Sequence, residues 1–327
     1  MTLKSLAFIG ALILPLVLSS AAGAQAPART ARIGLLDYGA PSASGEARWN
    51  ALRERLRELG YTEGRHVSFD MRWADGQADR LTSLATEMVE RKVDVIVTVT
   101  TEAALTVNRV TRSIPIVTAT GNPVAAGLAT SLARPGGNVT GVTSLNRNLN
   151  GKRLELLKQL LPHATRVAMV RDPDNRSSTA TLKDAESLGR PLGLAIQAYD
   201  LRADAFESAF AAMKRAHVQA IVMADNTPFL GVRQHLTDLA ISHRLPVIAS
   251  AREYAEAGAL MSYGTDYPDL FRRAAGYVDR ILRGAKPAEM PIEQPTKFEL
   301  VLNLKTGRAL GLKIPPQISG RADEVIQ

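Results

Sequence analysis

Cysteine is absent from this chain of 327 residues. Its absence excludes disulfide bridges, a thiolate nucleophile, iron–sulfur clusters, cysteine-bound zinc and a lipid attached through an N-terminal cysteine. The rest of the composition, with 46% hydrophobic and 22% charged residues, is ordinary for a globular protein and excludes disordered and collagen-like chains. The length exceeds that of one typical core, so we expect two lobes of about 100–200 residues each.

The N-terminal apolar segment is too short to cross a membrane. Residues 6–18 are uncharged and follow Lys4, but a membrane-spanning helix needs about 20 apolar residues. Small residues follow and offer cleavage near Ala24 or Ala26. Cleavage after Ala26 would place the rigid ring of Pro27 beside the scissile bond, so we favour Ala24. The sequence therefore predicts a signal peptide over residues 1–24 and export to the periplasm; the alternative is a short membrane anchor.

The positive charge is not gathered into basic runs. The chain has 40 Lys and Arg against 32 Asp and Glu, a formal net charge of +8. Proteins that bind nucleic acid cluster their basic residues on one face, whereas Arg53, Arg55 and Arg57 alternate with Glu54 and Glu58. This pattern is typical of a solvated helix face. We expect no nucleic-acid partner.

Short apolar runs alternate with amphipathic helical patterns along the chain. Continuous apolar strands separated by helices predict parallel sheets covered on both faces, a doubly wound α/β architecture. Eleven predicted strands are more than a single twisted sheet usually contains, so we expect two sheets. Turn-rich residues 133–138 and the extended stretch 286–295 are the candidate hinge crossings. The predicted strands are 32–38, 67–73, 93–99, 114–120, 139–144, 166–171, 194–201, 220–224, 246–250, 259–263 and 298–303.

Catalytic and cofactor motifs are missing. The turn from Gly34 to Gly39 lacks the G-x-G-x-x-G spacing, and Gly151-Lys152 lacks the rest of a phosphate loop. No G-x-S-x-G and no H-E-x-x-H occurs. His235 and His243 could share a helix face, but no carboxylate set accompanies them. The sequence predicts a binding protein rather than an enzyme, with no metal and no cofactor.

Polar residues follow the predicted strands, at the positions where helices begin. In parallel α/β sheets, ligands lie in the crevice beyond the carboxyl ends of the strands. A helix N-terminus with free N–H groups, such as the one after Thr100 and Thr101, suits a carboxylate. The candidate ligand-binding residues are Asp37, Tyr38, Thr100, Thr101, Asn122, Thr143, Asp172, Asn175, Asp225, Asn226, Ser250 and Tyr263.

Each candidate also has a purely structural role open to it. Asp225 with Asn226 is the favoured holder of an ammonium or hydroxyl group, and Asp225→Ala is expected to weaken binding without unfolding the protein. The structural alternatives are helix caps for Asp37, Thr100, Thr101, Asp225 and Asn226, turns for Asn122, Asp172 and Asn175, and packing for Tyr38 and Tyr263. Thr143 and Ser250 are weaker candidates.

Several longer stretches resemble one family over nearly the whole mature chain. The chain is similar to the periplasmic solute-binding components of ABC-type importers, in the branch linked to tryptophan and other aromatic amino acids. The most specific stretch is 293–306, EQPTKFELVLNLKT, followed by Gly311-Leu312 and Pro315-Pro316. The others are 58–64 (ELGYTEG), 72–76 (RWADG), 131–141 (SLARPGGNVTG), 151–157 (GKRLELL) and 260–264 (LMSYG).

The resemblance implies a type I periplasmic binding protein: two Rossmann-like, doubly wound lobes joined by three interlobe crossings, with the ligand between them. It suggests that strand 259–263 and helix 266–283 return to the first lobe. The expected lobes are therefore 31–145 plus 251–285, and 146–250 plus 286–327. Many relatives carry Asp where this chain has Asn122, which leaves the charge of the ligand open.

The function implied by the resemblance is solute capture by hinge closure. The expected ligand is a small polar solute, with amino acids and aromatic acids among the candidates, and the expected partners are an ABC permease and its ATPase. The chain is expected to act as a monomer. The alternative is a ligand-sensing periplasmic subunit of a signalling receptor, which shares the fold and the export signal.

Overall fold

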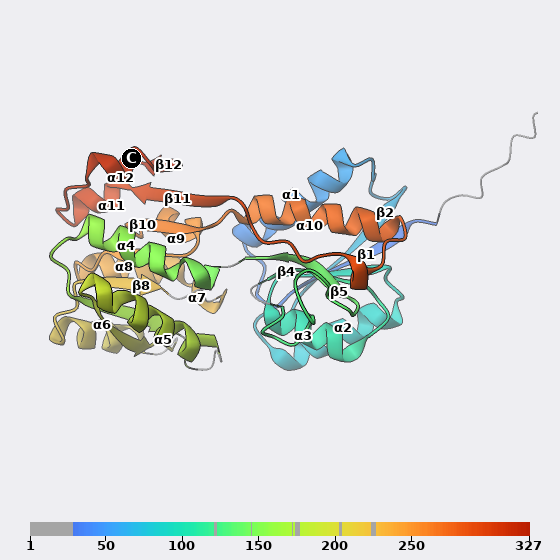
Figure 1. Ribbon diagram of the computed structural model, residues 1–327, viewed down its shortest axis with the longest axis horizontal. Helices are drawn as coiled ribbons and strands as arrows, with labels where there is room; N and C mark the ends of the chain where they lie inside the picture. The colour runs from blue at the N-terminus through green and yellow to red at the C-terminus, as the bar shows by residue number, and fades with distance from the viewer. Residues whose placement is uncertain are drawn as a thin grey trace, which may run out of the picture.

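The computed structural model of the chain describes residues 29–120, 123–144, 146–171, 173, 177–202, 205–223 and 227–327. Two lobes lie side by side along the long axis of the molecule (Figure 1). The predicted signal peptide lies outside the described residues and stays a prediction. No helix in the described ranges is long and apolar enough to cross a bilayer.

The first lobe is built on a five-stranded parallel sheet in the order β2-β1-β3-β4-β5. Its strands are short and β-branched, and Val95 and Val97 face one core while Ile96 faces the other. Burial on both faces explains why these strands are continuously apolar. The elements are β1 (Ala31–Asp37), α1 (Ala43–Glu58), β2 (Val67–Trp73), α2 (Ala78–Glu90), β3 (Val95–Thr98), α3 (Thr101–Val110), β4 (Ile116–Thr120), β5 (Val139–Thr143), α10 (Tyr267–Leu282) and η3 (Pro287–Glu289).

The second lobe is built on a seven-stranded sheet in the order β12-β11-β10-β9-β8-β6-β7. All its neighbouring strands are parallel except β10 and β11, which pair antiparallel. The elements are η1 (Asn146–Leu149), α4 (Asn150–Leu160), β6 (Arg166–Arg171), α5 (Ser177–Gly189), η2 (Arg190–Leu192), β7 (Ala195–Asp200), α6 (Phe206–Arg215), β8 (Ala220–Met223), α7 (Thr227–Gly231), α8 (Arg233–Ser242), β9 (Val247–Ala249), α9 (Arg252–Glu256), β10 (Met261–Thr265), β11 (Phe298–Asn303), α11 (Leu304–Ala309), α12 (Pro316–Ser319) and β12 (Glu324–Ile326).

Three crossings join the lobes: after β5, between β10 and α10, and before β11 (Figure 1). The crossings are bonded to one another. The backbone N–H of Thr143 donates to the carbonyl of Glu293 over 2.9 Å, and the hydroxyl of Thr265 donates to the carbonyl of Ser144. Lys297 pairs with Asp266 at 2.6 Å. We call this bonded set of crossings the hinge.

The predicted architecture of two doubly wound α/β lobes with three crossings is confirmed, and every predicted strand is present. One lobe assignment is wrong. Strand 259–263 does not return to the first lobe, because β10 pairs with β9 and β11 in the second sheet. Only α10 returns, packing against α1 and β4. Its amphipathic face buries Leu270, Phe271 and Ala274 in the first core.

Of the two segments expected to be hinge crossings, one lies within the first lobe and the other leads into a crossing. Residues 133–138 form a turn between β4 and β5 within the first lobe, so they are not a crossing. The stretch 286–295 does lead into the third crossing. Its first part still belongs with the first lobe, because the backbone of Glu293 pairs with β5. The chain therefore changes lobe a few residues later than the predicted boundary at residue 286.

Candidate functional site

In both lobes, the carboxyl ends of the mutually parallel strands β1–β5 and β6–β10 face the gap between the lobes, whereas β11 and β12 run the other way. The chain leaves the first sheet at the end of β5 and passes directly into the second lobe. It leaves the second sheet at the end of β10, which is parallel to β9, and passes directly into α10. Because parallel strands end at one edge, the loops that follow these parallel strands and start helices lie at this gap.

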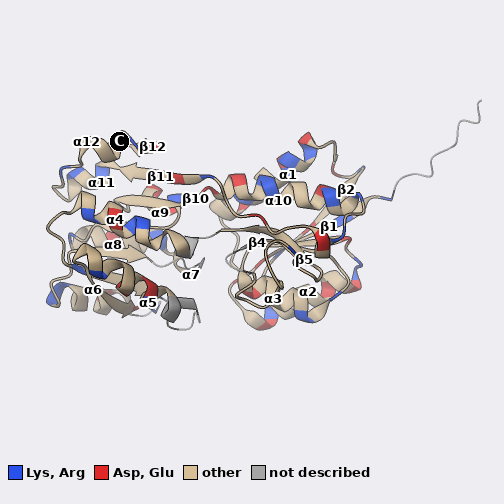
Figure 2. Cartoon of the chain, in the orientation of Figure 1, with Lys and Arg blue, Asp and Glu red and all other residues tan. Residues whose placement is uncertain are grey.

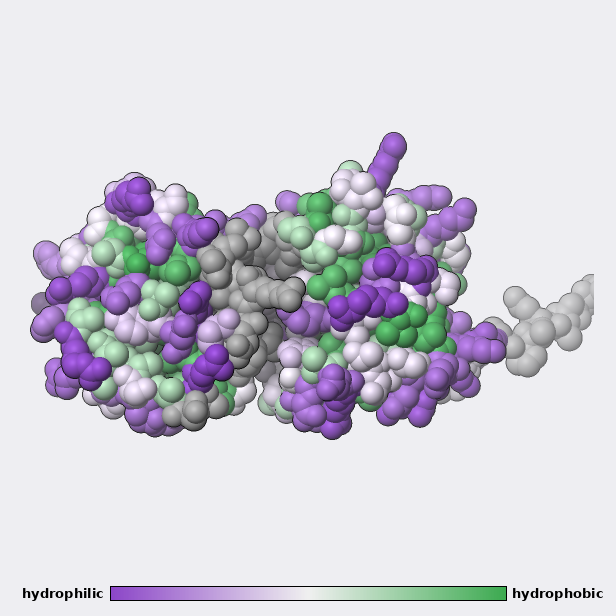
Figure 3. Space-filling model, turned by 90° about the horizontal axis from the view of Figure 1, so that it is seen from below, coloured by the Kyte–Doolittle hydropathy of each residue, from purple (hydrophilic) through white to green (hydrophobic). Residues whose placement is uncertain are grey.

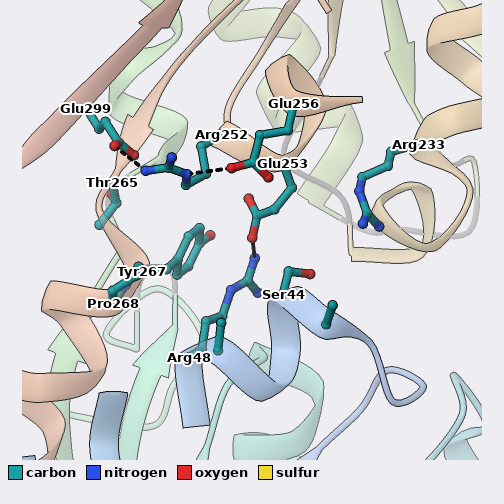
Figure 4. Close-up of a pocket in the computed structure, with 12 residues that line it drawn as sticks. Ser44, Arg48, Arg233, Arg252, Glu253, Glu256, Thr265, Tyr267, Pro268 and Glu299 are labelled. Atoms are coloured by element: carbon teal, nitrogen blue, oxygen red, sulfur yellow. Dashed lines mark hydrogen bonds and ion pairs between the residues drawn. The ribbon is translucent and has the colours of Figure 1, made fainter. Parts of the chain in front are cut away.

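A pocket of about 420 Å³ opens between the lobes at this edge. We call it the interlobe pocket. Its lining comes from the starts of α1 and α10 in the first lobe and from α8, α9, the end of β10 and β11 in the second (Figure 4). The lining residues are Ala43, Ser44, Ala47, Arg48, Arg233, Arg252, Glu253, Glu256, Thr265, Tyr267, Pro268 and Glu299.

Helix α1 carries the first-lobe wall of the pocket. The hydroxyl of Ser42 caps the helix by accepting the N–H of Gly45 over 3.1 Å. Ser44 and Arg48 are four residues apart and share one face, which lines the pocket. Trp49, one residue further round the helix, is buried in the first core and makes an edge-on contact with Phe271.

An ion pair crosses the pocket from one lobe to the other. Arg48 Nη2 of α1 lies 2.6 Å from Glu253 Oε1 of α9, and the guanidinium stacks over the ring of Tyr267 at 4.3 Å (Figure 4). Burial would lower the pKa of Arg48, but attraction to Glu253 and to Asp37 outweighs burial and raises this pKa. Arg48 is therefore held charged inside the pocket wall.

Arg252 fixes α9 to the rest of the second lobe. Its guanidinium pairs with three carboxylates: Glu256 on α9, Glu299 on β11 and Glu324 on β12. Burial opposes the charge of Arg252, and these acids outweigh it and raise its pKa. Burial raises the pKa of Glu299, with Arg252 acting against the shift. The network makes α9 a rigid support for Glu253.

Arg233 is the arginine of the pocket that no carboxylate neutralises within the described ranges. It is half-buried at the start of α8, and one Nη donates to the carbonyl of Leu230 over 2.7 Å. Figure 4 shows its side chain extending from the second lobe toward the first. The remaining guanidinium donors suit an anionic group.

Asp37 and Tyr38 lie at the end of β1, as predicted. Asp37 is buried and accepts the N–H of Gly39 over 2.9 Å and the indole N–H of Trp49 over 3.3 Å. Burial raises the pKa of this carboxyl, with Gly39, Arg48 and Trp49 acting against the shift. Asp37 thus holds α1 in place. Tyr38 donates its hydroxyl to the carbonyl of Gly76 over 2.7 Å. Direct solute contact by either residue stays a prediction.

The capping alternative applies to Thr100. Its hydroxyl accepts the N–H of Ala103 over 3.1 Å, which makes it the N-cap of α3, and Thr101 is the first helical residue. Thr100 is buried, whereas Thr101 is half-buried. The capping role and a solute contact at the same helix start are compatible, and the contact stays a prediction.

Three buried threonines, Thr98, Thr118 and Thr143, lie in the neighbouring strands β3, β4 and β5, with Thr143 two residues further along its strand than the residue opposite Thr118. Thr98 lies directly opposite Thr118 in the sheet, and each comes two residues after an isoleucine of the core that α2 and α3 cover. Their hydroxyls make no hydrogen bond within the described part of the chain. Buried hydroxyls normally have a partner. These three threonines therefore place unused hydrogen-bonding capacity near the carboxyl edge of the first sheet, and they include the predicted residue Thr143.

Ser250 and Tyr263 belong to the second lobe. Ser250 is buried directly after β9, two residues before Arg252. Tyr263 packs in the core beneath α4, near Phe298 at 6.4 Å between ring centroids, and its carbonyl accepts from Arg153 over 2.7 Å. The packing alternative describes its position. Five other candidates lie outside the described residues: Asn122, Asp172, Asn175, Asp225 and Asn226.

Sequence reasoning did not find the charged residues of the interlobe pocket. Arg48, Arg233 and Glu253 lie in or near the first turns of helices that follow strands, whereas the search stopped at the strand ends. The available signal was a charged residue in those first turns. Among the described residues, no group of histidine and acidic side chains could hold a metal ion.

Charges of both signs are mixed over the described residues of both lobes. Lys and Arg alternate with Asp and Glu over both lobes (Figure 2). Seen from below, each lobe carries hydrophilic residues interspersed with hydrophobic areas (Figure 3). No face visible in Figure 2 gathers the basic residues of the described ranges in the way that nucleic-acid-binding proteins do.

Comparison with known proteins connects this two-lobed site to transport. A family model described as ABC transporter substrate binding protein matches residues 43–326. The tyrosine-binding protein of Clostridioides difficile (strain R20291) is 25% identical over 259 residues, covering 79% of this chain and 74% of that protein.

Two solved structures share the arrangement. An ABC domain from Streptococcus pneumonia in complex with L-Trp has a TM-score of 0.84 and 25% identity, and the match covers 91% of this chain and 100% of that one. A conserved domain protein from Vibrio cholerae has a TM-score of 0.84 and 26% identity over the same shares. The chain belongs to the family of ABC transporter substrate-binding proteins, with the type I periplasmic binding protein fold.

Proposed function

We propose that this protein captures a small polar solute in the periplasm and delivers it, chemically unchanged, to the permease of an ABC-type importer. The observation that carries the proposal is the interlobe pocket, which both lobes line at the carboxyl edges of their sheets. Its volume of about 420 Å³ suits a small molecule. Membership of the substrate-binding family supports the same function.

The proposed mechanism is closure of the lobes about the hinge. The three crossings are bonded to one another, so the lobes can rotate about one narrow region. A solute that touches both lobes stabilises the closed form only by the difference between its affinities for the closed and open forms. The closed form is what the permease would recognise.

Two features at the carboxyl edges of the sheets favour a solute that carries a carboxylate. Arg233 offers guanidinium donors to a carboxylate, and the predicted helix start at Thr100 and Thr101 offers N–H groups. Relatives at 25% identity include a tyrosine-binding protein and a domain solved with L-Trp. L-tryptophan and L-tyrosine are therefore the first solutes to test. Asn122, Asp172, Asn175, Asp225 and Asn226 remain proposed contacts.

Mass spectrometry of the small molecules released by denaturing the purified protein tests the proposal. We expect one retained solute, recovered with its mass unchanged after incubation. A thermal-shift screen of amino acids should then show a rise in the melting temperature with the same solute, because a ligand that binds only the folded state stabilises it. Conversion of the solute into a product of different mass would contradict the proposal.

The role of Arg233 has its own test. Arg233→Gln should weaken calorimetric binding of a carboxylate solute by about tenfold or more, since hydrogen bonds to charged groups are worth about 1.5–3 kcal/mol. Arg215→Gln is the matched control, because Arg215 is an exposed arginine of the same lobe at the end of α6. Equal affinities in the two variants would remove Arg233 from the site.

Delivery to a permease needs a test in cells. Uptake of the labelled solute should fall when the gene is deleted and return when it is restored. Normal uptake in the deletion strain, together with loss of a transcriptional or motility response to the solute, would favour the sensing alternative instead.

A further inference from the structure

One ion pair connects the lobes away from the hinge. Arg48 belongs to α1 of the first lobe and Glu253 to α9 of the second, 205 residues apart in the sequence. Their atoms approach to 2.6 Å, and the side chains are only 11% and 9% exposed. Rotation of the lobes about the hinge changes the distance between α1 and α9, so this contact depends on how the lobes are placed.

Both partners are mounted on fixed supports. On the first-lobe side, Asp37 anchors α1 through Trp49, and the ring of Tyr267 lies under the Arg48 guanidinium. On the second-lobe side, Arg252 ties α9 to β11 and β12. Both side chains project from helices that are already held in place. Forming the pair therefore costs little backbone conformational entropy.

The pair is attractive but incompletely bonded. Attraction to Glu253 outweighs the effect of burial on the Arg48 pKa, so contact favours the charged pair. The hydrogen-bond partnership uses one Nη and one Oε, while Nε of Arg48 and Oε2 of Glu253 make no hydrogen bond within the described part of the chain. Separation of the pair lets water hydrogen-bond to the two unbonded polar atoms, and this gain offsets part of the lost attraction. The pair can therefore open.

We propose that the Arg48–Glu253 pair is an interlobe latch, which favours the close arrangement of the lobes before solute binds and thereby sets the affinity for solute. The inference rests on the proposed mechanism of hinge closure. A latch that raises the fraction of closed molecules raises the apparent affinity by the same factor, because less of the binding free energy is then spent on closing the lobes.

The latch is tested first without any solute. Since the chain contains no cysteine, Ser83→Cys on α2 and Ser187→Cys on α5 give two unique, exposed sites for spin labels in opposite lobes. In ligand-free protein, Arg48→Gln and Glu253→Gln should each shift the distance distribution away from that of the parent toward more widely separated lobes. A distribution unchanged by both substitutions would overturn the latch.

A double-mutant cycle separates a latch from two unrelated substitutions. If the residues act on each other, Arg48→Gln combined with Glu253→Gln should shift the distances no further than the stronger single variant. Glu58→Gln is the matched control, because Glu58 on α1 pairs with Arg272 of α10 at 2.7 Å inside one lobe. The control should leave the distances unchanged. Additive shifts would overturn the latch.

Affinity gives the second readout. The dissociation constant of the solute released from the purified protein should rise about tenfold in either single variant, the lower end of coupling measured for close charge pairs across interfaces, and should be unchanged in Glu58→Gln. The two proposals fail separately. Unchanged label distances with normal solute binding contradict only the latch, whereas shifted distances in a protein that binds no solute contradict only the proposed function.

Discussion

The hinge and the pocket join the same two lobes by different kinds of contact. At the hinge, backbone bonding links two crossings: the N–H of Thr143, where the first crossing begins, donates to the carbonyl of Glu293, which leads into the third. Across the pocket, the contact is between two side chains, Arg48 and Glu253. Backbone bonds survive most substitutions, but a side-chain pair can be removed by one. The hinge therefore keeps the lobes connected, while the pocket side can open.

Disrupting the close contact between β5 and β4, beside the hinge, should have the largest effect. Gly141 in β5 has φ of +130°, and a Cβ there would lie 2.3 Å from the carbonyl oxygen of Thr118. Gly141→Ala should lower the free energy of unfolding by roughly 2–5 kcal/mol, through backbone strain and a clash with the neighbouring strand. Urea denaturation measures the loss. Gly137→Ala, where a Cβ meets nothing within 4 Å, is the control, and equal losses in both variants would contradict the account.

Removing a side-chain bond at the hinge should have a smaller effect. Thr265→Val keeps the shape of the side chain but leaves the buried carbonyl of Ser144 without the hydroxyl that donates to it. We expect a loss of about 1–3 kcal/mol in the free energy of unfolding. Thr82→Val on α2, whose hydroxyl bond is solvent-exposed, should change stability by less than about 0.5 kcal/mol. A Thr265 variant as stable as this control would show that the hinge does not depend on this side-chain bond.

A third effect, which depends on pH, is expected at Tyr277. Its hydroxyl donates to Pro291 beside the third crossing, and burial, aided by Glu293 and opposed by Arg280, raises its pKa to about 12. The unfolded tyrosine titrates near its ordinary value of 10. Between these values the folded state keeps a proton that the unfolded state has lost. Stability should therefore fall as pH rises from 10 toward 12, by at most about 1.4 kcal/mol per pH unit.

Tyr277→Phe provides the comparison for the alkaline experiment. The variant lacks the titrating hydroxyl, so urea denaturation at a series of pH values should show a shallower decline between pH 10 and 12 than the parent. Parallel declines in the two proteins would mean that the hydroxyl at the hinge is not held in its protonated form.

The architecture was predictable because local sequence patterns determine where the strands and helices form. Apolar β-branched runs and amphipathic helices identified the strands and both lobes. Membership of β10 in the second sheet was not predictable in this way. Met261 pairs with Ile248 and Leu302, and such pairing between strands depends on tertiary structure rather than on the local sequence. The terminal strand β12 was missed because it has three half-buried residues and little apolar signal.

The site was predictable only as a location. Parallel strands dictate that ligands lie at their carboxyl edge, which is where the interlobe pocket opens. The sequence does not say which charged residues meet there. Arg48 lies in a helix rich in charged residues, and Glu253 comes from the other lobe. Each alone has the pattern of a solvated helix face, and only folding brings the two together.

The central claim is that solute binding brings the lobes together, and the label pair at Ser83→Cys and Ser187→Cys measures this directly. Adding the solute recovered from the purified protein should shorten and narrow the distance distribution, to the same extent at saturation in the parent and in Glu58→Gln. Saturating solute that binds by calorimetry yet leaves the distances unchanged would contradict closure as the mechanism.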